Sequence, residues 1–309
     1  MAIVYGTNNP PDSIEFLDMT ASQAQQYGLQ DDRVTGLGGN DFITTGLGSD
    51  ILSGDNGNDV LSDGGGNDSV YAGAGDDLVK VDAGNDVYHG GSGSDTLSFS
   101  VIHVGASGGE DNYTGIKLDL AGKARQDFGE FGIDEFYGFE NATGSYGHDT
   151  IYGTNSVNSL MGLSGNDKLY GRGGNDTLTG GSGADLLVGG QGADAIYTDS
   201  GNAAPDTSRD IVRYESLKDS GTTASTRDVV YGFKAGQDKI DLSKIDANLG
   251  LKGNQAFKVV TGFTKAFGEV RLVKSGNDTL VQVDGDKDNS IDMTILVKNA
   301  HLTKADFIL

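Results

Sequence analysis

The sequence predicts an all-β protein whose centre is a regular stack of short strands. Two observations predict it: a nine-residue period that recurs in thirteen units, and a column of apolar residues in phase with that period. Glycine makes up 50 of the 309 residues and proline only 3, which excludes a collagen helix and a proline-rich linker. We expect a cap before the repeats and a β-rich domain after them.

The first block of repeats, residues 36–98, contains seven consecutive units. In each unit the fourth residue is glycine, the sixth is aspartate and the eighth is apolar or aromatic. The aspartates at position six are Asp41, Asp50, Asp59, Asp68, Asp77, Asp86 and Asp95. The residues at position eight are Ile43, Leu52, Leu61, Val70, Val79, Tyr88 and Leu97.

The second block, residues 144–197, contains six units in which position eight is always isoleucine or leucine. One unit departs from the pattern, because Asn158 stands at position six and Ser156 in the preceding glycine column. The remaining residues at position six are Asp149, Asp167, Asp176, Asp185 and Asp194.

Each column has a physical reason. A short strand with one inward side chain explains the apolar eighth residue, because side chains along a strand alternate between its faces. Glycine permits the positive φ of a tight loop, and a turned loop points its carbonyl oxygens toward one centre. Aspartate adds charged oxygens, and a hard cation such as Ca²⁺ takes about six to eight oxygen ligands. The columns therefore predict calcium sites in the loops.

The repeats resemble the RTX nonapeptide, G-G-x-G-x-D-x-U-x. The resemblance implies a parallel β-roll in which two units form one turn and Ca²⁺ lies between loops two units apart in sequence. Asp41 would then share an ion with Asp59, and Asp50 with Asp68. If every loop is competent, the two blocks would hold about nine ions. The site that pairs Asn158 with Asp176 is expected to be weak or empty.

Composition narrows the partners. A net charge of −23 and an isoelectric point near 4.3 repel nucleic acid and anionic membranes. The charge is uneven, because 15 of the 22 lysines and arginines lie from Arg209 onward. There is no cysteine, which excludes disulfides and thiolate metal sites, and no apolar run is long enough to span a bilayer. The N-terminal residues do not form a classical signal peptide.

A disordered, acidic, glycine-rich linker is the alternative to a folded roll. The apolar residue at every eighth position argues against it, because a linker has no need of such a column. We expect disorder only in the metal-free chain, since one inward residue per unit buries too little apolar surface to offset the entropy of the ordered backbone.

Two segments outside the blocks lack the repeat. Residues 1–35 are expected to form a cap that closes the core, with a capping box at Thr20–Gln23 opening a short helix; a small binding epitope is the alternative. Residues 99–143 form an insert in which Ile116–Leu120 alternates as a strand does. The insert is five times nine residues long, so we expect one elongated solenoid that carries this insertion in its middle.

The C-terminal segment, residues 198–309, resembles the C-terminal domain of serralysin-type metalloproteases. The likeness rests on "DVVYGFKAGQDKIDLSKID", on "TLVQVDGDKDNSIDMTILV" and on the closing "DFIL". It implies a β domain that carries a signal for type I secretion, here Asp306, Phe307, Ile308 and Leu309. Together with the repeats, the resemblance covers residues 36–309.

One further acidic motif lies in this segment. Asp284, Asp286 and Asp288 have the one-three-five spacing of an EF-hand loop, but Ile295 replaces the glutamate at position twelve. A polar hairpin turn and a lone Ca²⁺ site are the two interpretations, and we treat these aspartates as weaker candidates for metal ligands.

Nothing in the sequence predicts catalysis. There is no H-E-x-x-H motif and no nucleophile elbow, and the four histidines (His89, His103, His148 and His301) are scattered. The protease half of the serralysins is missing from this sequence. We therefore expect no enzymatic activity and no catalytic residue.

These expectations combine into one hypothesis. The chain is expected to be a bacterial protein that is exported by a type I system, folds on extracellular Ca²⁺, and acts in adhesion, matrix or surface-layer assembly, or host interaction. Its partners would be calcium ions, the secretion machinery, and either a surface glycan or a second copy. The alternatives are a carbohydrate-binding module like those of alginate epimerases, the secretion half of a protease, and an enzyme of unrecognised chemistry.

Overall fold

The computed structural model of the chain describes residues 3–4, 13–15, 31–100, 115–122, 125–129, 132–199, 207–248 and 253–309. The helix expected at Thr20–Gln23 and the side chain of His103 lie outside these residues. The chain divides into two compact units, Met1–Tyr146 and Gly147–Leu309. The second repeat block and the C-terminal segment thus share a unit, while the five-part division of the sequence remains a prediction.

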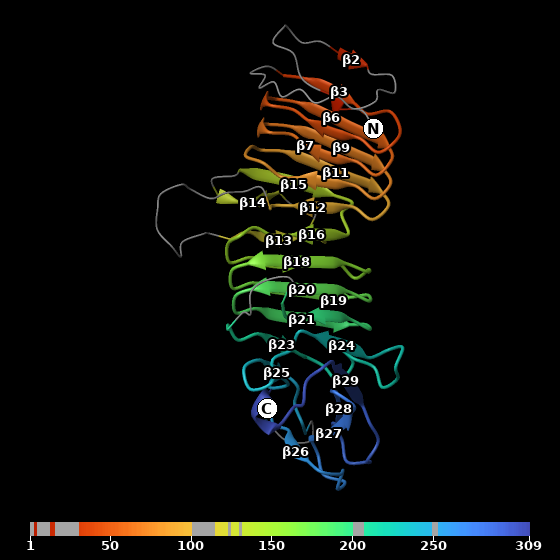
Figure 1. The fold of residues 1–309 in the computed structure, drawn as a ribbon, viewed down its shortest axis with the longest axis vertical. Coiled ribbons are helices and arrows are strands. Elements are labelled where there is room, and N and C mark those ends of the chain that lie inside the picture. The colour runs from red at the N-terminus through yellow and green to blue at the C-terminus, as the bar shows by residue number, and fades with distance from the viewer. Residues whose placement is uncertain are drawn as a thin grey trace. The chain divides into compact units, whose positions relative to one another are not determined.

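The first unit contains two parallel sheets whose strands follow one another in stacked turns (Figure 1). One sheet has the order β1 (Ile3–Val4), β4 (Phe42–Thr44), β7 (Val60–Ser62), β10 (Leu78–Lys80), β12 (Thr96–Ser98) and β16 (Asn141–Thr143). The other has the order β2 (Ser13–Glu15), β3 (Arg33–Thr35), β6 (Ile51–Asn56), β9 (Ser69–Ala74), β11 (Val87–Ser92), β15 (Ile133–Tyr137) and the antiparallel β14 (Gln126–Asp127). Two short pieces, β5 (Leu47–Gly48) and β8 (Gly65–Gly66), pair with each other, and β13 (Lys117–Asp119) lies in the expected strand of the insert.

The register within each sheet confirms the repeat as the unit of the fold. Leu61 pairs with Val79, and Leu52 with Val70, so neighbouring strands are eighteen residues apart. Every residue at position eight of the first block is fully buried. After the insert the stack resumes, because Phe136 of β15 pairs with Tyr88 and Ala142 of β16 pairs with Leu97. The chain is therefore an all-β parallel roll, as the sequence predicts.

The second unit continues the same construction through the second repeat block. One sheet has the order β18 (Ser159–Ser164), β20 (Thr177–Ser182), β22 (Ala195–Tyr197), β24 (Asp228–Tyr231), β29 (Met293–Val297), β28 (Asp278–Asp284), β27 (Glu269–Ser275) and β26 (Lys258–Val260). The other has the order β17 (Thr150–Tyr152), β19 (Lys168–Gly173), β21 (Leu186–Gln191), β23 (Ile211–Arg213), β25 (Lys239–Asp241) and β30 (Phe307–Ile308). A 3₁₀ turn, η2 (Lys304–Asp306), precedes β30.

The C-terminal segment departs from the roll at β27, β28 and β29, which pair antiparallel. These strands are longer than most strands of the roll, and aliphatic residues make up much of their buried face, together with Glu269, Thr279 and Thr294. The fully buried residues of this part include Val270, Val281, Val283, Ile295 and Val297. This end of the second unit therefore has an ordinary apolar core.

More residues of each repeat face the interior of the roll than the sequence predicts. Position one of most units of the first block is buried as well as position eight, so the prediction of one inward residue per unit was incomplete. The residues at position one of the first block are Gly36, Thr45, Gly54, Asp63, Ala72, Val81 and Gly90. All six residues at this position in the second block are glycine. The interior is therefore narrow, and it is lined by both columns.

Candidate metal centre

The aspartates at position six form a continuous ladder through each block. The backbone N–H of one aspartate donates to Oδ1 of the aspartate eighteen residues later, at 2.7 Å from Asp41 to Asp59 and 2.6 Å from Asp50 to Asp68. In the second block Asp149 donates to Asp167 at 2.8 Å and Asp167 to Asp185 at 2.9 Å. The structure therefore brings together the pairs that the sequence analysis expects to share an ion.

The second carboxylate oxygen of most of these aspartates has no hydrogen bond. Each such Oδ2 atom is buried, although a carboxylate accepts hydrogen bonds readily from water or from protein donors. The aspartates concerned are Asp50, Asp59, Asp68, Asp77, Asp95, Asp167, Asp176 and Asp194. A buried charge without a partner is costly, so these oxygens need a cation or a proton.

The free oxygens lie against the residue at position one of the same unit. A Cβ atom added to Gly54 would collide with Asp59 Oδ2 and with the carbonyl oxygen of Ala72. Gly162 has the same surroundings, with Asp167 Oδ2 and the carbonyl oxygen of Gly180. A carboxylate and a carbonyl oxygen thus converge on space that only glycine leaves open. Hard oxygen donors in such an arrangement fit Ca²⁺.

Burial changes the protonation of these carboxyl groups. It raises the pKa of Asp59 to about 6, that of Asp68 to about 7 and that of Asp167 to about 8, while the backbone N–H donors lower it in part. The neighbouring aspartates of the ladder raise each of these values further. Without a cation, several members of the ladder therefore compete for protons near neutral pH.

Asn158 is built differently from the aspartates around it. Its backbone N–H donates to Asp176 Oδ1 at 2.8 Å, as the ladder requires. Its own Oδ1, however, accepts hydrogen bonds from the backbone N–H and the hydroxyl of Thr154, at 2.6 and 3.2 Å. An amide oxygen that is already satisfied is a weaker ligand than a free carboxylate. The geometry supports the expectation of a weak site between Asn158 and Asp176.

The ladder extends beyond the glycine-rich motif to residues that the sequence analysis missed. Asp86 donates to Asp134 Oδ1 at 2.9 Å, Asp194 to Asp228 Oδ1 at 2.9 Å, and Asp210 to Asp238 Oδ1 at 3.1 Å. The missed aspartates of the ladder are Asp32, Asp134, Asp210, Asp228 and Asp238, and Glu140 accepts from Asp95 in the same way. Each precedes a buried apolar residue by two positions, so the tripeptide D-x-apolar was the signal that could have found them.

A separate acidic group lies in the turn between β28 and β29. Asp284 is buried, neither of its carboxylate oxygens accepts a hydrogen bond, and burial raises its pKa to about 6. Oxygens of Asp284, Asp286 and Asp292 lie within 4.8 Å of one another. Asp288 is not part of this group, and its Oδ1 accepts from the backbone N–H of Ser290. The structure therefore groups Asp292 with two of the three candidates that the spacing suggests.

The four C-terminal residues are integrated into the second unit. Asp306 is buried, its Oδ1 accepts from the backbone N–H of Gly236 at 2.6 Å, and its Oδ2 accepts from that of Thr303 at 2.7 Å. Phe307 is also buried, and it pairs with Ile240 of β25. Ile308 and Leu309 are the more exposed pair. The tail is thus a strand of the folded sheet.

The described histidines do not form a common site. His89 stacks between Tyr71 and Tyr137, with ring centroids 4.9 Å apart on either side. His148 and His301 are exposed. These positions agree with surface roles for the histidines.

Two known protein families match parts of the chain. The family described as Peptidase M10 serralysin C terminal matches residues 82–309. The family described as RTX calcium-binding nonapeptide repeat (4 copies) matches residues 28–61 and 62–97. No curated protein matches the chain.

Two solved structures are among those that match. Both are subunits of the mannuronan C5-epimerase of Azotobacter vinelandii. AlgE6R3 is 24% identical over 52% of this chain and 78% of its own, with a TM-score of 0.21. AlgE6R2 is 24% identical over 54% of this chain and 91% of its own, with a TM-score of 0.24.

The part of the chain that the structure describes contains no helix with the length and apolar character of a transmembrane span.

Proposed function

The chain belongs to the Peptidase M10 serralysin C terminal family, and from this premise we propose that it is exported by a type I system and folds outside the cell as it binds Ca²⁺. Its RTX repeats make it a calcium-binding β-roll protein. The observation that carries the proposal is the row of buried carboxylate oxygens without hydrogen bonds in both repeat blocks. No protein donor compensates them, so the folded roll needs another source of positive charge.

The proposed ligands are the members of the ladder. They are Asp41, Asp50, Asp59, Asp68, Asp77, Asp86 and Asp95 in the first block and Asp149, Asp167, Asp176, Asp185 and Asp194 in the second. Asp134 and Asp228, whose Oδ2 atoms are also buried without hydrogen bonds, are further ligands. Asp284, Asp286 and Asp292 would hold one more ion. Bound Ca²⁺ supplies the positive charge that these carboxylates lack.

The concentration of Ca²⁺ then determines where the chain folds. The narrow interior alone buries too little apolar surface, so binding free energy becomes folding free energy. Cytosolic Ca²⁺ is too scarce to fill sites of moderate or weak affinity, whereas extracellular Ca²⁺ is abundant enough. The chain would therefore remain unfolded during synthesis and export.

The packing of the tail supports this order of events. Asp306 and Phe307, the first two residues of the proposed secretion signal, are buried in the folded unit. An exporter could not contact them in that state. Export of an unfolded chain, followed by folding on Ca²⁺, leaves the signal accessible while it is needed and buries it afterwards.

The activity that we propose outside the cell is not catalytic. The repeats account for the paired carboxylates, and the described histidines lie apart on the surface. We assign the protein to adhesion, to matrix or surface-layer assembly, or to host interaction, with a surface glycan or a second copy as partner. A module like those of alginate epimerases, or the secretion half of a protease, are the competing assignments.

A secretion assay tests the export step. The full chain and a chain lacking residues 306–309 would be expressed in a bacterial host that carries a type I exporter, in medium with little Ca²⁺. We expect the full chain in the medium and the truncated chain in the cells. The control is Ile240→Asp, which disrupts the folded contact with Phe307 but leaves the tail intact and should not reduce export. Equal secretion of the full and truncated chains would contradict the role of the tail.

A further inference from the structure

One unit of the first block carries an acidic residue inside the roll. Asp63 stands at position one, where the other units have glycine, alanine, valine or threonine. In the same column of the stack its neighbours are Thr45 and Val81, eighteen residues before and after it. A carboxylate in a column that otherwise carries small or apolar residues requires its own explanation.

Asp63 is completely buried, and its only hydrogen bond given by the structure is at its backbone carbonyl, which accepts from the Thr45 hydroxyl at 2.6 Å. Its exposed fraction is 0%, and neither Oδ1 nor Oδ2 accepts a hydrogen bond. The ladder aspartates differ from it, because their Oδ1 atoms accept a backbone N–H. The carboxylate of Asp63 therefore lacks the backbone N–H donor that partly compensates the carboxylates of the ladder.

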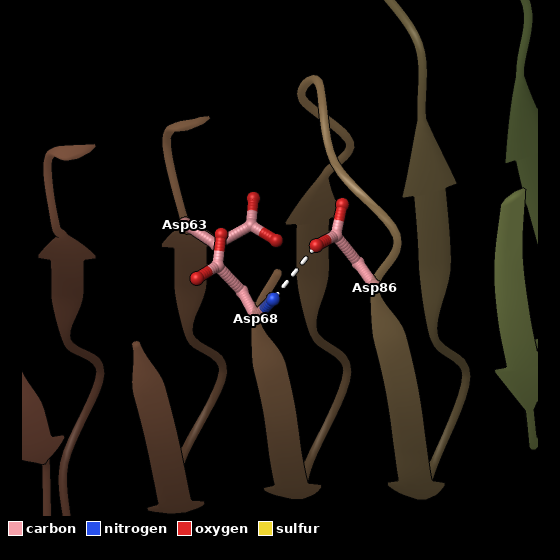
Figure 2. A group of neighbouring side chains, drawn as sticks. All are labelled: Asp63, Asp68 and Asp86. Carbon is pink, nitrogen blue, oxygen red and sulfur yellow. Dashed lines mark hydrogen bonds between the residues drawn. The ribbon is translucent and has the colours of Figure 1, made fainter. Parts of the chain in front are cut away.

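The carboxylate of Asp63 lies beside two members of the ladder (Figure 2). Oxygens of Asp63, Asp68 and Asp86 all lie within 4.8 Å of one another, and all three residues are buried. Asp68 belongs to the same unit as Asp63, and its backbone N–H donates to Asp86 Oδ1 at 2.7 Å. The turn that places position six against position one thus brings the third carboxylate to this pair.

A hydroxyl group completes the surroundings of these carboxylates. Tyr88 is the single aromatic residue at position eight of either block, and it donates to Asp86 Oδ2 at 3.1 Å. Its ring stacks on Phe136, with centroids 5.4 Å apart, and this contact fixes the direction of the hydroxyl. The four side chains form one buried oxygen-rich group inside an otherwise apolar interior.

Three carboxylates so close together cannot all be charged without a counterion. Protons could neutralise the group, but a valine like Val81 would fill the same column without any such cost. A fully buried acid at this place is explained by a ligand that needs it.

We propose that Asp63, Asp68 and Asp86 form a three-carboxylate cation site inside the first block, and that it binds Ca²⁺ more tightly than the regular loop sites do. The inference rests on the proposed function in one respect, because Asp68 and Asp86 are also ladder ligands. A third carboxylate raises the charge of the site, and ligand charge is a main determinant of Ca²⁺ affinity. The same charge favours trivalent lanthanides over Ca²⁺. Tyr88 is a positioning residue that orients Asp86.

The test compares the full-length protein with Asp63→Asn and Asp63→Val. Ca²⁺ binding is measured by equilibrium dialysis and by calorimetry. We expect the wild type to bind one ion about tenfold more tightly than the others, and both variants to bind that ion no more tightly than the remainder. The control is Asp55→Asn, which removes the same charge from a partly exposed position of the neighbouring unit and should retain the tight ion.

Terbium luminescence provides a second measurement at the same site. Excitation through tyrosine should produce emission from the first equivalent of Tb³⁺, because the Tyr88 hydroxyl contacts a ligand of the ion. We expect Tyr88→Phe to reduce the emission of this equivalent without changing the number of ions bound. Emission from the first equivalent that is the same in Asp63→Asn as in the wild type would contradict the proposal.

The two variants also separate a metal site from a structural role. In saturating Ca²⁺, Asp63→Val should fold to the same circular dichroism spectrum as the wild type, because an apolar side chain fits a column that also contains Val81. A variant that fails to fold in saturating Ca²⁺ would show that Asp63 serves packing, and it would overturn the proposal. If the wild type and all variants bind no Ca²⁺, the proposed function itself fails. If the loop sites fill and Asp63→Asn keeps the tight ion, only this inference fails.

Discussion

The repeat blocks and the terminal antiparallel sheet stabilise β-structure in opposite ways. In the repeats, the position-six aspartates of stacked turns are buried, and most keep one oxygen without a hydrogen bond. In β27, β28 and β29, aliphatic side chains make up much of the buried face, and the Lys298 ammonium lies 2.6 Å from the Asp278 carboxylate near the surface. The terminal sheet thus resembles an ordinary protein core, with charges paired at its edge.

The difference shows what each region needs in order to fold. The terminal sheet buries enough apolar side chains to be stabilised by its own residues. The roll has a narrow interior, and its buried charges oppose folding unless a cation is present. Asp284, at the end of β28, is an exception within these strands, because its buried carboxylate accepts no hydrogen bond, whereas the buried carboxylate of Glu269 accepts from Thr264. We therefore expect the roll to depend on Ca²⁺ for folding and the terminal sheet to depend on it much less.

Removal of Ca²⁺ should produce the largest effect. We expect amide protection in residues 36–98 and 144–197 to collapse in chelator at neutral pH, because the carboxylates of the ladder are then uncompensated. Protection in β27, β28 and β29 should fall much less. Hydrogen exchange with mass spectrometry, with and without Ca²⁺, measures both regions in one sample. Equal loss of protection in the two regions would contradict the division.

The second effect is a dependence on pH in the metal-free protein. Burial raises the pKa of Asp59 to about 6, that of Asp194 to about 7 and that of Asp167 to about 8, from 3.8 for an ordinary aspartate. The folded roll therefore binds protons more tightly than the unfolded chain, and its free energy of unfolding should fall as the pH rises from about 4 to about 8. Ca²⁺ affinity should rise over the same range, since ions compete with these protons.

Urea unfolding of metal-stripped protein at a series of pH values measures this dependence. A metal-free roll that gains stability between pH 5 and pH 8, an interval within the range of the raised pKa values, would rule out the assigned protonation states.

Truncation of buried side chains should change the free energy of unfolding in the two regions differently, with a smaller effect than removal of Ca²⁺ or a change of pH. Ile295→Ala removes a fully buried side chain from the terminal sheet and should cost about 2–5 kcal/mol with or without Ca²⁺. Leu169→Ala, equally buried in the roll, should have a comparable cost only when Ca²⁺ is present. Urea unfolding followed by circular dichroism measures both variants. The comparison fails if Leu169→Ala is destabilising in chelator to the same degree as in Ca²⁺.

Single ligand exchanges should have the smallest effect. Asp167→Asn should weaken the two Ca²⁺ sites that it shares with Asp149 and Asp185, each by about tenfold, or about 1.4 kcal/mol, because it replaces a free carboxylate with an amide. Asn158→Asp should have the opposite effect and strengthen the site shared with Asp176. Calorimetric titration of the two variants beside the wild type provides the measurement. An unchanged affinity in both would show that position six does not supply ligands.

The sequence predicts the repeats well, because three columns in phase leave little choice of fold. The strands and the burial of Ile43 or Leu178 follow from the nine-residue period, whereas the eighteen-residue spacing of neighbouring strands is what the resemblance to the RTX nonapeptide implies. Asp228 could not be found in this way, since the residues before it have lost the glycines of the motif. Asp134 keeps Gly129 and Gly132 before it, but it lies outside the two blocks and out of phase with them. Their place in the ladder depends on strands that return to the stack after long loops.

Two other features also depend on the folded chain. In the sequence, only its residue type distinguishes Asp63 from the other residues at position one. Its place beside Asp68 and Asp86 becomes visible only in the folded chain, where position six packs against position one. Asp292 joins Asp284 because the turn between β28 and β29 brings them together, whereas the linear spacing favours Asp288. Both groups arise from loop geometry, which periodicity does not determine.

The central claim is that the buried carboxylates of the roll fold only with a cation. The most direct measurement is a Ca²⁺ titration of metal-stripped full-length protein at neutral pH, followed by far-ultraviolet circular dichroism. The account predicts a largely disordered spectrum without Ca²⁺, apart from the terminal sheet, and a cooperative gain of β-structure as Ca²⁺ approaches extracellular levels. A complete β spectrum in chelator, unchanged by added Ca²⁺, would contradict it.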